Sequence, residues 1–539
     1  MNFIKKDNFI IFIFFLSYLL LGINIVKNYS VSFDEESNRL YGLVNGNYIL
    51  KTFLDEEKYN SIFSNIINES FSEKIKIKQP TPLYEFADRA YGVIFELPIT
   101  AIEILLNFEN THDVYVFRHF ATFLFFFISL IIFYLFLRKI FKNKLIALSG
   151  IIILISNPRI FADSFYNSKD IVFLSFFLIT FYFAYSFILK NKIKNLIFLS
   201  FFSACSINLR AIAVIIPFMV YMEIFYKIIK TKKFKIEIIY FPLISILFLY
   251  IIWPLLWESP INNLIYVLSW FKEIPINIEN FYLGNNHNAL NTPWHYLFVW
   301  ILNTTPAFIL ILMLIGTILL IFGEKKYLKL YLIFFYTLLV PFCLVIFLNI
   351  ALYDGWRHFY FIAPFLTILC LITLDAIFYY KINQNLKFIF LIVIFSLFLK
   401  NVNDMRKIHP YENLYFNYLF VSSPYETFDK DYWGLTNRIV LENFYSIVSD
   451  DRVIYGDAST IITKTSDFLS KFHDRKFIHY KDIKNLNEGP LYYFVLNRYH
   501  PPYKIIKKNS EIIYEYKIDN EIINGVYKFN SVKNFLEMQ

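Results

Sequence analysis

The feature that most limits the fold of this chain is a succession of apolar runs about as long as a lipid bilayer is thick. A helix needs about 20 apolar residues to cross the hydrocarbon core, and about eleven runs come close to that length. Hydrophobic residues make up 57% of the 539 residues, more than a soluble protein can bury. The sequence therefore predicts a mainly α-helical protein that crosses the membrane many times. The runs lie at 9–27, 118–137, 145–157, 171–189, 196–209, 211–226, 236–256, 298–322, 328–350, 358–379 and 386–400.

Short basic connections between these runs predict the orientation of the chain. Lys and Arg concentrate in the short cytoplasmic loops of membrane proteins, so we expect the N-terminus and these loops to be cytoplasmic. About eleven crossings then place the C-terminus on the external side. These loops also account for the formal net charge of +9, which therefore does not indicate a nucleic-acid partner. The basic loops are 138–144, 190–195, 226–235, 323–329 and 379–387.

A long first external loop is predicted at 28–117. Within it, residues 91–108 are apolar but are interrupted by Glu96, Pro98 and Glu103. We expect this stretch to form a helix that lies in the membrane interface. The alternative is a further crossing, which would place the later basic loops outside, against the charge pattern.

The composition divides the chain into two parts. Residues 1–400 contain the apolar runs and form the predicted transmembrane domain. Residues 401–539 have a higher charge density and no long apolar run. Helical periodicity at 434–449 and short strand-like runs at 452–456 and 491–497 predict a small external α/β domain.

Acidic residues stand directly beyond the first apolar run, where Asp34 and Glu35 begin the sequence DEE. One interpretation is a solvated acidic patch at a helix N-terminus, which such charges stabilise. The other is catalysis, because a carboxylate at the membrane surface can act as a general base on an acceptor hydroxyl. An enzyme of this kind also needs cations to hold an anionic leaving group.

Candidate cations lie on the same predicted face. Arg210 stands between two apolar runs, and it either reaches the interface with its charged end or contacts a phosphate. Arg357 and His358 follow a turn formed by Asp354 and Gly355. The planar, permanently charged guanidinium suits phosphate, whereas His358 could equally serve packing or capping.

The second external loop, at 157–170, supplies further charge. Its candidate site residues are Asp163, Lys169 and Asp170. Asp170 directly precedes an apolar run, so it could instead be an N-cap residue.

Several stretches, all on the predicted external side and in the same order, resemble the GT-C glycosyltransferases. The similarity is greatest to bacterial relatives of the dolichyl-phosphate-mannose protein mannosyltransferase and aminoarabinose transferase group. It implies a GT-C-like helical bundle in the bacterial inner membrane, with the C-terminal domain in the periplasm. The stretches are SFDE at 32–35, NPRIFADSFYNSKDIVF at 157–173, TPWHYLFVWILNTTP at 292–306, LYDGWRHFYFIAP at 352–364, HPYENLYFNYLF at 409–420 and DYWGLTNR at 431–438.

The resemblance implies a hexosyltransferase that takes its sugar from a polyprenyl-phosphate donor and inverts the anomeric carbon. Asp34 would deprotonate the acceptor hydroxyl, with Glu35 as the alternative base or a substrate-orienting partner. Arg210, Arg357 and His358 would hold the departing lipid phosphate.

Three aromatic or heteroaromatic residues complete the predicted site. Trp294, His295 and Tyr296 would line a groove for the lipid or the acceptor, or they would form part of an interfacial aromatic belt. No cofactor is implied, and a divalent metal ion is possible but not indicated, because no cluster has recognisable ligand spacing.

Two other function classes stay open at the level of sequence. The same external charges could bind the head group of a lipid-linked sugar in a transporter or flippase, without chemistry. The chain could also be an assembly protein for envelope glycans, with the C-terminal domain binding a partner. The sequence does not identify the sugar or the class of acceptor, which could be a protein, a lipid or a glycan.

Overall fold

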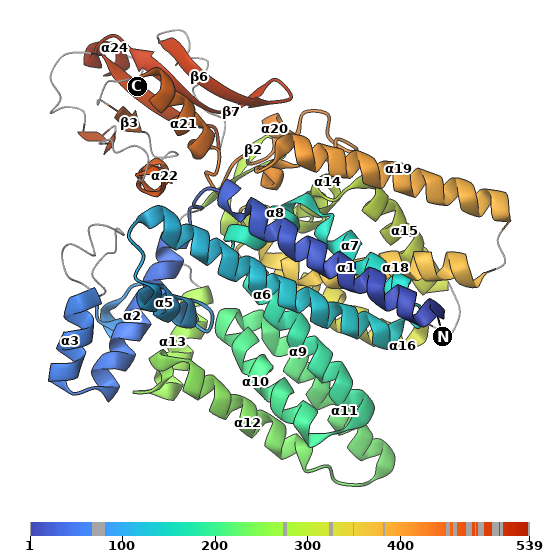
Figure 1. Cartoon of the computed structure of the whole chain (residues 1–539). Helices are drawn as coiled ribbons and strands as arrows, with labels where there is room; N and C mark the ends of the chain where they lie inside the picture. Colours follow the sequence, from blue (N-terminus) through green and yellow to red (C-terminus); the bar gives the residue numbers. More distant parts are fainter. Residues whose placement is uncertain are drawn as a thin grey trace.

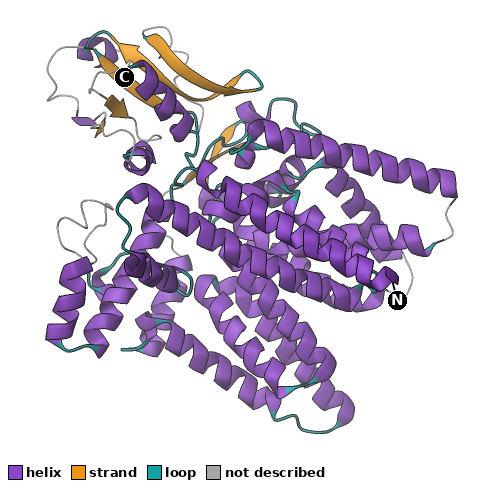
Figure 2. Cartoon of the chain, in the orientation of Figure 1, coloured by secondary structure: helices purple, strands orange, loops and turns teal. Residues whose placement is uncertain are grey.

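The structure is a computed structural model of the whole chain (Figure 1). It shows a helical bundle with a small sheet-containing domain at one end (Figure 2). The described residues are 2–66, 81–272, 278–322, 327–348, 350–380, 383–448, 453–455, 461–470, 477–479, 481–482, 490–498, 506 and 510–536. Parts of the predicted loops at 28–117, 323–329 and 379–387 lie outside them.

Seven helical segments among the described residues are long and apolar enough to cross a membrane. Each corresponds to one of the predicted runs, which confirms a multi-pass, mainly α-helical membrane protein. The seven are Lys6–Asn28 in α1 (Asn2–Ile25) and η1 (Val26–Asn28), α6 (Thr111–Ile140), α9 (Asp170–Lys190), Ala211–Thr231 in η3 (Ala211–Val214) and α11 (Ile215–Thr231), Leu330–Leu348 in α16 (Leu328–Phe334), η7 (Phe335–Leu339) and α17 (Val340–Leu348), Arg357–Tyr379 in η8 (Arg357–Ile362) and α18 (Ala363–Tyr379), and α19 (Gln384–Ile408).

The other four predicted runs form shorter or broken helices. The pair α7 (Lys144–Ile155) and α8 (Pro158–Tyr166) is bent by 74° and brings the number of possible spans to eight. The helices α10 (Ile193–Leu209), α12 (Glu237–Ile252) and α15 (Ala307–Phe322) have 16 or 17 residues. At 1.5 Å per residue they reach about 25 Å, less than the hydrocarbon thickness. The predicted number of about eleven spans therefore counts these shorter helices as well.

The second predicted external loop contains a helix that was not predicted. Residues 158–166 form α8. The Asn157 side chain accepts a hydrogen bond from the Ile160 amide (3.4 Å), and Pro158 occupies the first turn. Both features favour a helix start.

The first external loop folds into helices beside the bundle (Figure 1). The apolar stretch predicted to lie in the interface contains α5, whose eleven residues span about 16 Å. This is too short to cross the bilayer, which argues against the alternative of an extra span. The elements of this loop are α2 (Glu35–Phe53), α3 (Glu56–Ile66), η2 (Leu83–Glu85) and α5 (Glu96–Leu106).

The segment before α15 also has more structure than predicted. A hairpin of β1 (Glu279–Tyr282) and β2 (Asn285–Asn288) lies within it. The run predicted at 298–322 is divided into two helices at Pro306, which lacks an amide hydrogen for the helix ladder. The remaining elements here are η4 (Pro254–Leu256), α13 (Pro260–Lys272), η5 (Ala289–Asn291) and α14 (Tyr296–Thr304).

The C-terminal domain carries a five-stranded mixed sheet with the order β4-β3-β5-β7-β6. Strand β3 is parallel to β4 and β5, whereas β7 is antiparallel to β5 and β6. The predicted helix and both predicted strands are confirmed in their described residues. The elements are η9 (Glu412–Leu414), α20 (Pro424–Thr427), α21 (Asn437–Ile447), β3 (Val453–Tyr455), α22 (Ile461–Leu469), β4 (Phe477–His479), β5 (Leu491–Leu496), β6 (Glu511–Ile518), β7 (Glu521–Phe529) and α24 (Val532–Leu536).

The two parts are joined more closely than the predicted boundary at residue 400 suggests. Helix α19 continues to Ile408, and buried side chains from 411–435 belong to the main core of the helical bundle. Strands β3, β5 and β7 pack with α21 and α22 in separate cores. The segment 409–436 therefore fastens the sheet domain onto the bundle.

Candidate functional site

Four of the predicted site residues form one connected ionic cluster. The Arg357 Nη1 atom lies 3.1 Å from the Asp34 Oδ2 atom and 3.1 Å from the Asp170 Oδ2 atom. The other Asp170 oxygen pairs with Arg210. The four residues stand at the start of α2, the start of α9, the end of α10 and the start of η8.

Asp34 is the most exposed carboxylate in this cluster. Its side chain is 30% exposed, compared with 1% for Asp170. It occupies the N-cap position of α2 but makes no side-chain capping hydrogen bond. Among the described residues, only Arg357 donates to its carboxylate. Asp34 therefore stands at a helix N-terminus, as the first interpretation expects, but its carboxylate is directed to Arg357 rather than to the helix amides.

Asp170 holds the two arginines together. It begins α9, but Asn167 caps this turn, because the Asn167 Oδ1 atom accepts from the Asp170 amide at 2.8 Å. The Asp170 carboxylate is therefore free of capping and bridges Arg210 and Arg357. The expected alternative role of Asp170 as an N-cap is wrong, because Asp170 is the first residue of α9 and Lys169 precedes it at the N-cap position.

A strained turn places Arg357. Asp354 and Gly355 both have left-handed backbone conformations, with φ of 57° and 73°, which aspartate tolerates better than most residues and glycine adopts freely. The Gly355 amide donates to the Tyr296 hydroxyl at 3.2 Å. The Asp354 Oδ2 atom accepts from Arg357 Nη2 at 2.9 Å. Asp354 was expected only to form the turn, and its pairing with Arg357 was not predicted.

The other two acids of the DEE sequence are engaged elsewhere. Glu35 is 4% exposed, lies 2.8 Å from the His119 Nε2 atom, and accepts from the Ser32 amide at 2.6 Å. Glu36 pairs with Lys464 of the sheet domain at 3.0 Å. Of these three acids, Asp34 is the one whose ion pair with the arginine cluster is seen in the described part of the chain.

A second, fully buried ionic group supports the site from below and was not predicted. Arg118 pairs with Glu96 and with Glu103 (2.8 Å), and Arg39 binds the other Glu103 oxygen at 2.6 Å. The two arginines hold the pKa of Glu103 below its usual value despite its burial. Burial raises the pKa of Glu96. The group ties α2, α5 and α6 together, because a buried charge is tolerated only when it is paired.

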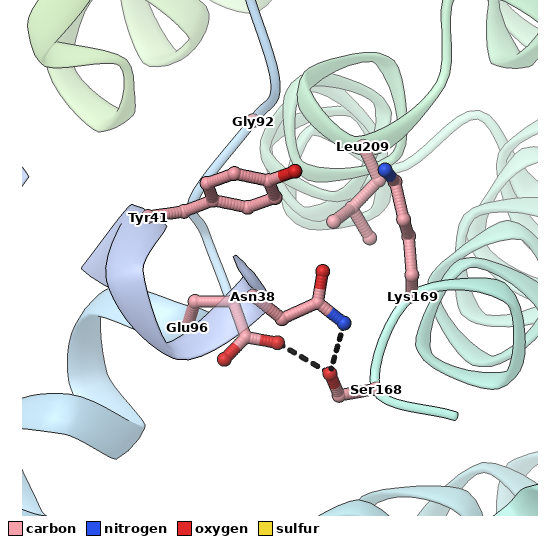
Figure 3. Close-up of a pocket in the computed structure, with 7 residues that line it drawn as sticks. All are labelled: Asn38, Tyr41, Gly92, Glu96, Ser168, Lys169 and Leu209. Carbon is pink, nitrogen blue, oxygen red and sulfur yellow. Dashed lines mark hydrogen bonds between the residues drawn. The ribbon is translucent and has the colours of Figure 1, made fainter. Parts of the chain in front are cut away.

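A small pocket adjoins the cluster (Figure 3). It has room for about one water molecule, less than a hexose ring requires. The Ser168 hydroxyl accepts from Asn38 at 3.1 Å and donates to Glu96. Three residues that line the pocket are close in sequence to residues of the cluster. Asn38 is one helical turn from Asp34, Lys169 precedes Asp170, and Leu209 precedes Arg210. The lining residues are Asn38, Tyr41, Gly92, Glu96, Ser168, Lys169 and Leu209.

Lys169 presents an ammonium group to this pocket. Its Nζ atom lies 3.2 Å from the centroid of the Tyr91 ring and 5.8 Å from that of Tyr41. Burial, followed by the nearby charge of Arg210, lowers the pKa of Lys169 to about 7. No carboxylate pairs with it within the described part of the chain, so it remains available to an anion.

Two other predicted site residues, Asp163 and His358, lie close enough to the cluster to interact electrostatically with Asp170. Asp163 is fully buried within α8, where its oxygens accept from the Tyr166 hydroxyl (2.6 Å) and the Asn167 amide (3.1 Å). The Asn167 side-chain amide links it to the site, because this group also donates to the Asp170 carboxylate at 3.1 Å. His358 is half-buried with its ring 4.5 Å from that of Tyr353.

The three residues expected to line a groove have different surroundings. Trp294 is 69% exposed, whereas Tyr296 is fully buried beneath the Asp354–Gly355 turn. The His295 Nδ1 atom lies 2.6 Å from the Tyr282 hydroxyl. These three residues therefore do not line one groove with the cluster, because consecutive residues at the start of α14 face different directions.

Within the described ranges, no group of three His, Cys, Asp or Glu side chains has the geometry to hold a metal ion. The acidic residues of the cluster are instead neutralised by arginine. The positive charge left for an anion comes from Lys169 and from the 22%-exposed Arg210, which lie beside a partly exposed carboxylate.

Comparison with known proteins finds a family match for part of the chain. Residues 109–257, which include Asp170 and Arg210, match the family described as dolichyl-phosphate-mannose-protein mannosyltransferase. No curated protein sequence gives a significant match.

Two crystal structures of ArnT from Cupriavidus metallidurans are similar over nearly the whole chain. The apo structure has 9% sequence identity and a TM-score of 0.45, with 98% of each chain covered. The structure bound to undecaprenyl phosphate has 10% identity and a TM-score of 0.44, with 96% of this chain and 97% of that chain covered. The match over residues 109–257 confirms the predicted resemblance: this segment of the chain is similar to the dolichyl-phosphate-mannose-protein mannosyltransferase family.

Proposed function

We propose that the chain is a membrane glycosyltransferase that moves a sugar from a polyprenyl-phosphate donor to an acceptor hydroxyl. The observation that carries this proposal is the placement of Asp34, a partly exposed carboxylate, against a cluster that holds two arginines. The family match supports the reaction class. A base and an anion-binding group at one end of a membrane bundle are the two parts that such a transfer requires.

Asp34 is the proposed general base. Arg357 binds one of its carboxylate oxygens, which fixes the side chain and leaves the other oxygen for the acceptor. Glu35 was the alternative base, but it is buried and already contacts Ser32 and His119. We therefore assign Glu35 to holding the start of α2.

Arg210 and Lys169 are the proposed phosphate contacts. The Arg210 side chain is 22% exposed and its Nε atom has no hydrogen-bond partner within the described ranges. Lys169 has no paired carboxylate there either. Arg357 is 4% exposed and binds three carboxylates, so we assign it to positioning Asp34 rather than to phosphate.

The proposed step is a single displacement with inversion. Asp34 takes the proton of the acceptor hydroxyl as its oxygen forms a bond to the anomeric carbon. The bond from that carbon to the phosphate oxygen breaks, and polyprenyl phosphate leaves with the electron pair. Phosphate is a stable anion, so the cations beside it suffice and no acid is needed to protonate it.

The orientation follows from the charge pattern. With the basic loops in the cytoplasm, the cluster and the sheet domain lie on the external side, which is the periplasm if the chain belongs to a bacterial inner membrane. The lipid-linked donor would then enter laterally from the outer leaflet. The partners are this donor, membrane lipids and an acceptor that bears a hydroxyl group.

The test is to incubate the purified protein with a panel of polyprenyl-phosphate sugars and hydroxyl acceptors, and to measure released polyprenyl phosphate. We expect release only with one class of donor, in proportion to the glycosylated acceptor formed. Movement of the donor between the leaflets of proteoliposomes, with no lipid phosphate released, would instead indicate a transporter.

A further inference from the structure

The sheet domain reaches directly into the ionic cluster. Arg498, which follows β5, pairs with the Asp354 Oδ1 atom. The other oxygen of the same carboxylate, Oδ2, accepts from Arg357 at 2.9 Å. Asp354 therefore bridges one arginine from each part of the chain, and the connection continues through Arg357 to Asp34.

Arg498 is held in place by the backbone around it. Its amide donates to the Leu496 carbonyl at 2.9 Å, and its carbonyl accepts from the Lys430 amide at 3.2 Å. Its side chain is only 16% exposed, and that of Asp354 is 9% exposed. A charged pair that is this well shielded is stronger and more directional than one on the surface.

Other contacts from residues 409–539 fix the segment that carries Asp34. The Trp433 carbonyl accepts from the Phe33 amide at 3.1 Å, and the Trp433 ring lies 4.6 Å from the Arg357 guanidinium. Lys464 donates to the Phe33 carbonyl at 3.1 Å. Residues 409–539 therefore contact both Arg357 and the backbone next to Asp34.

We propose that the C-terminal domain positions the active site, and that Arg498 is the residue through which it fixes Arg357 and hence Asp34. This inference rests on the proposed glycosyl transfer. Arg498 is a positioning residue, because two side chains separate it from the proposed reacting atoms. Loss of Arg498 leaves Asp354 with one cation in place of two and removes the anchor of the Asp354–Arg357 pair to the sheet domain, so that this pair can shift. A displacement of about 1 Å can cost about 100-fold in rate.

The test uses the full-length protein with the substitution Arg498→Ala. We expect kcat for transfer to fall by about 10- to 100-fold with little change in the KM for the donor, because Arg210 and Lys169 are untouched. Lys528→Ala is the matched control, since Lys528 lies on the same domain and its ion pair with Glu511 is long (3.7 Å) and solvent-exposed. A kcat for Arg498→Ala equal to that of Lys528→Ala would overturn the proposal.

Two further measurements separate positioning from folding. Guanidinium ions added to folded Arg498→Ala should restore part of the lost kcat by occupying the vacant place, whereas a misfolded protein would not respond. If Arg498→Ala does not fold, Arg498→Lys carries the test, because it keeps the charge but lacks the planar fork. We expect an intermediate kcat for Arg498→Lys, and a wild-type value would overturn the proposal.

A readout without substrate distinguishes failure of this inference from failure of the proposed function. We expect hydrogen exchange at residues 29–38 and 352–358 to be several-fold faster in Arg498→Ala than in wild type or Lys528→Ala. Unchanged exchange overturns the positioning role, whether or not the protein transfers sugar. A wild-type protein that transfers no sugar, with exchange faster in the variant, overturns the proposed function alone.

Discussion

Asp170 is the residue whose loss should disturb the cluster most directly. It is 1% exposed and pairs with both Arg210 and Arg357, so Asp170→Asn removes a charge that two arginines share while keeping the side-chain volume. Breaking a buried ion pair costs about 3–5 kcal/mol. Arg210 is 22% exposed and can regain water, and Arg357 keeps Asp34 and Asp354. We therefore expect the lower end, about 3 kcal/mol.

This loss can be measured by unfolding the purified protein in mixed detergent micelles with increasing dodecyl sulfate, followed by tryptophan fluorescence. A change of about 3 kcal/mol corresponds to roughly 100-fold in the unfolding equilibrium. Asp404→Asn is the control, because Asp404 pairs with the 69%-exposed Lys400 and such pairs contribute at most about 0.5 kcal/mol. Equal shifts for the two variants would refute the idea that Asp170 holds the cluster together.

Three further predictions concern the donor, the packing and the pH dependence. Arg210→Ala should raise the KM for the lipid-linked donor about 10-fold or more and leave the fold intact. An unchanged KM would show that Arg210 does not contact the donor phosphate and has only a structural role. Gly316→Ala should destabilise the protein by about 1–3 kcal/mol in thermal unfolding, because a Cβ atom there would overlap the Leu369 carbonyl. Gly46→Ala is the control: its Cβ atom would meet only Leu97, at 3.6 Å, so this variant should be neutral or slightly stabilising. Burial raises the pKa of Asp429 to about 8 in the folded protein, above its value in the unfolded chain. Between about pH 4 and pH 8 the folded state therefore holds a proton on Asp429 that the unfolded state has lost, so the stability should decrease as the pH rises through this range. The same pH profile of stability in Asp429→Asn would contradict this.

The sequence predicts the bundle well because hydropathy and charge act locally. The apolar runs become helical, although Pro306 divides the run at 298–322 into two helices. The alternation of basic loops places Asp34, Asp170, Arg210 and Arg357 at one end, where the structure finds them connected. The helix count was less reliable, because packing inside a bundle lets helices such as α10 be shorter than a span.

The pairing inside the site could not be predicted from local pattern. Asp354 reads as a turn residue, yet it also bridges Arg357 and Arg498, which lies 144 residues away in the chain. Glu96 and Glu103 interrupt an apolar stretch and were taken as marks of an interfacial helix, whereas Arg118 and Arg39 neutralise them in the interior. Unusual acids in apolar surroundings were the available signal, but their partners come from other helices.

The most direct test of the central claim compares binding with transfer in Asp34→Asn. The amide keeps the size of the side chain but cannot take a proton, and the proposed phosphate contacts, Arg210 and Lys169, are unchanged. We expect the dissociation constant of the donor to stay within a few-fold of wild type while transfer falls by at least about 100-fold, as is typical for loss of a general base. Near-normal transfer by Asp34→Asn would contradict the claim, as would a loss of donor binding that fully accounts for the loss of transfer.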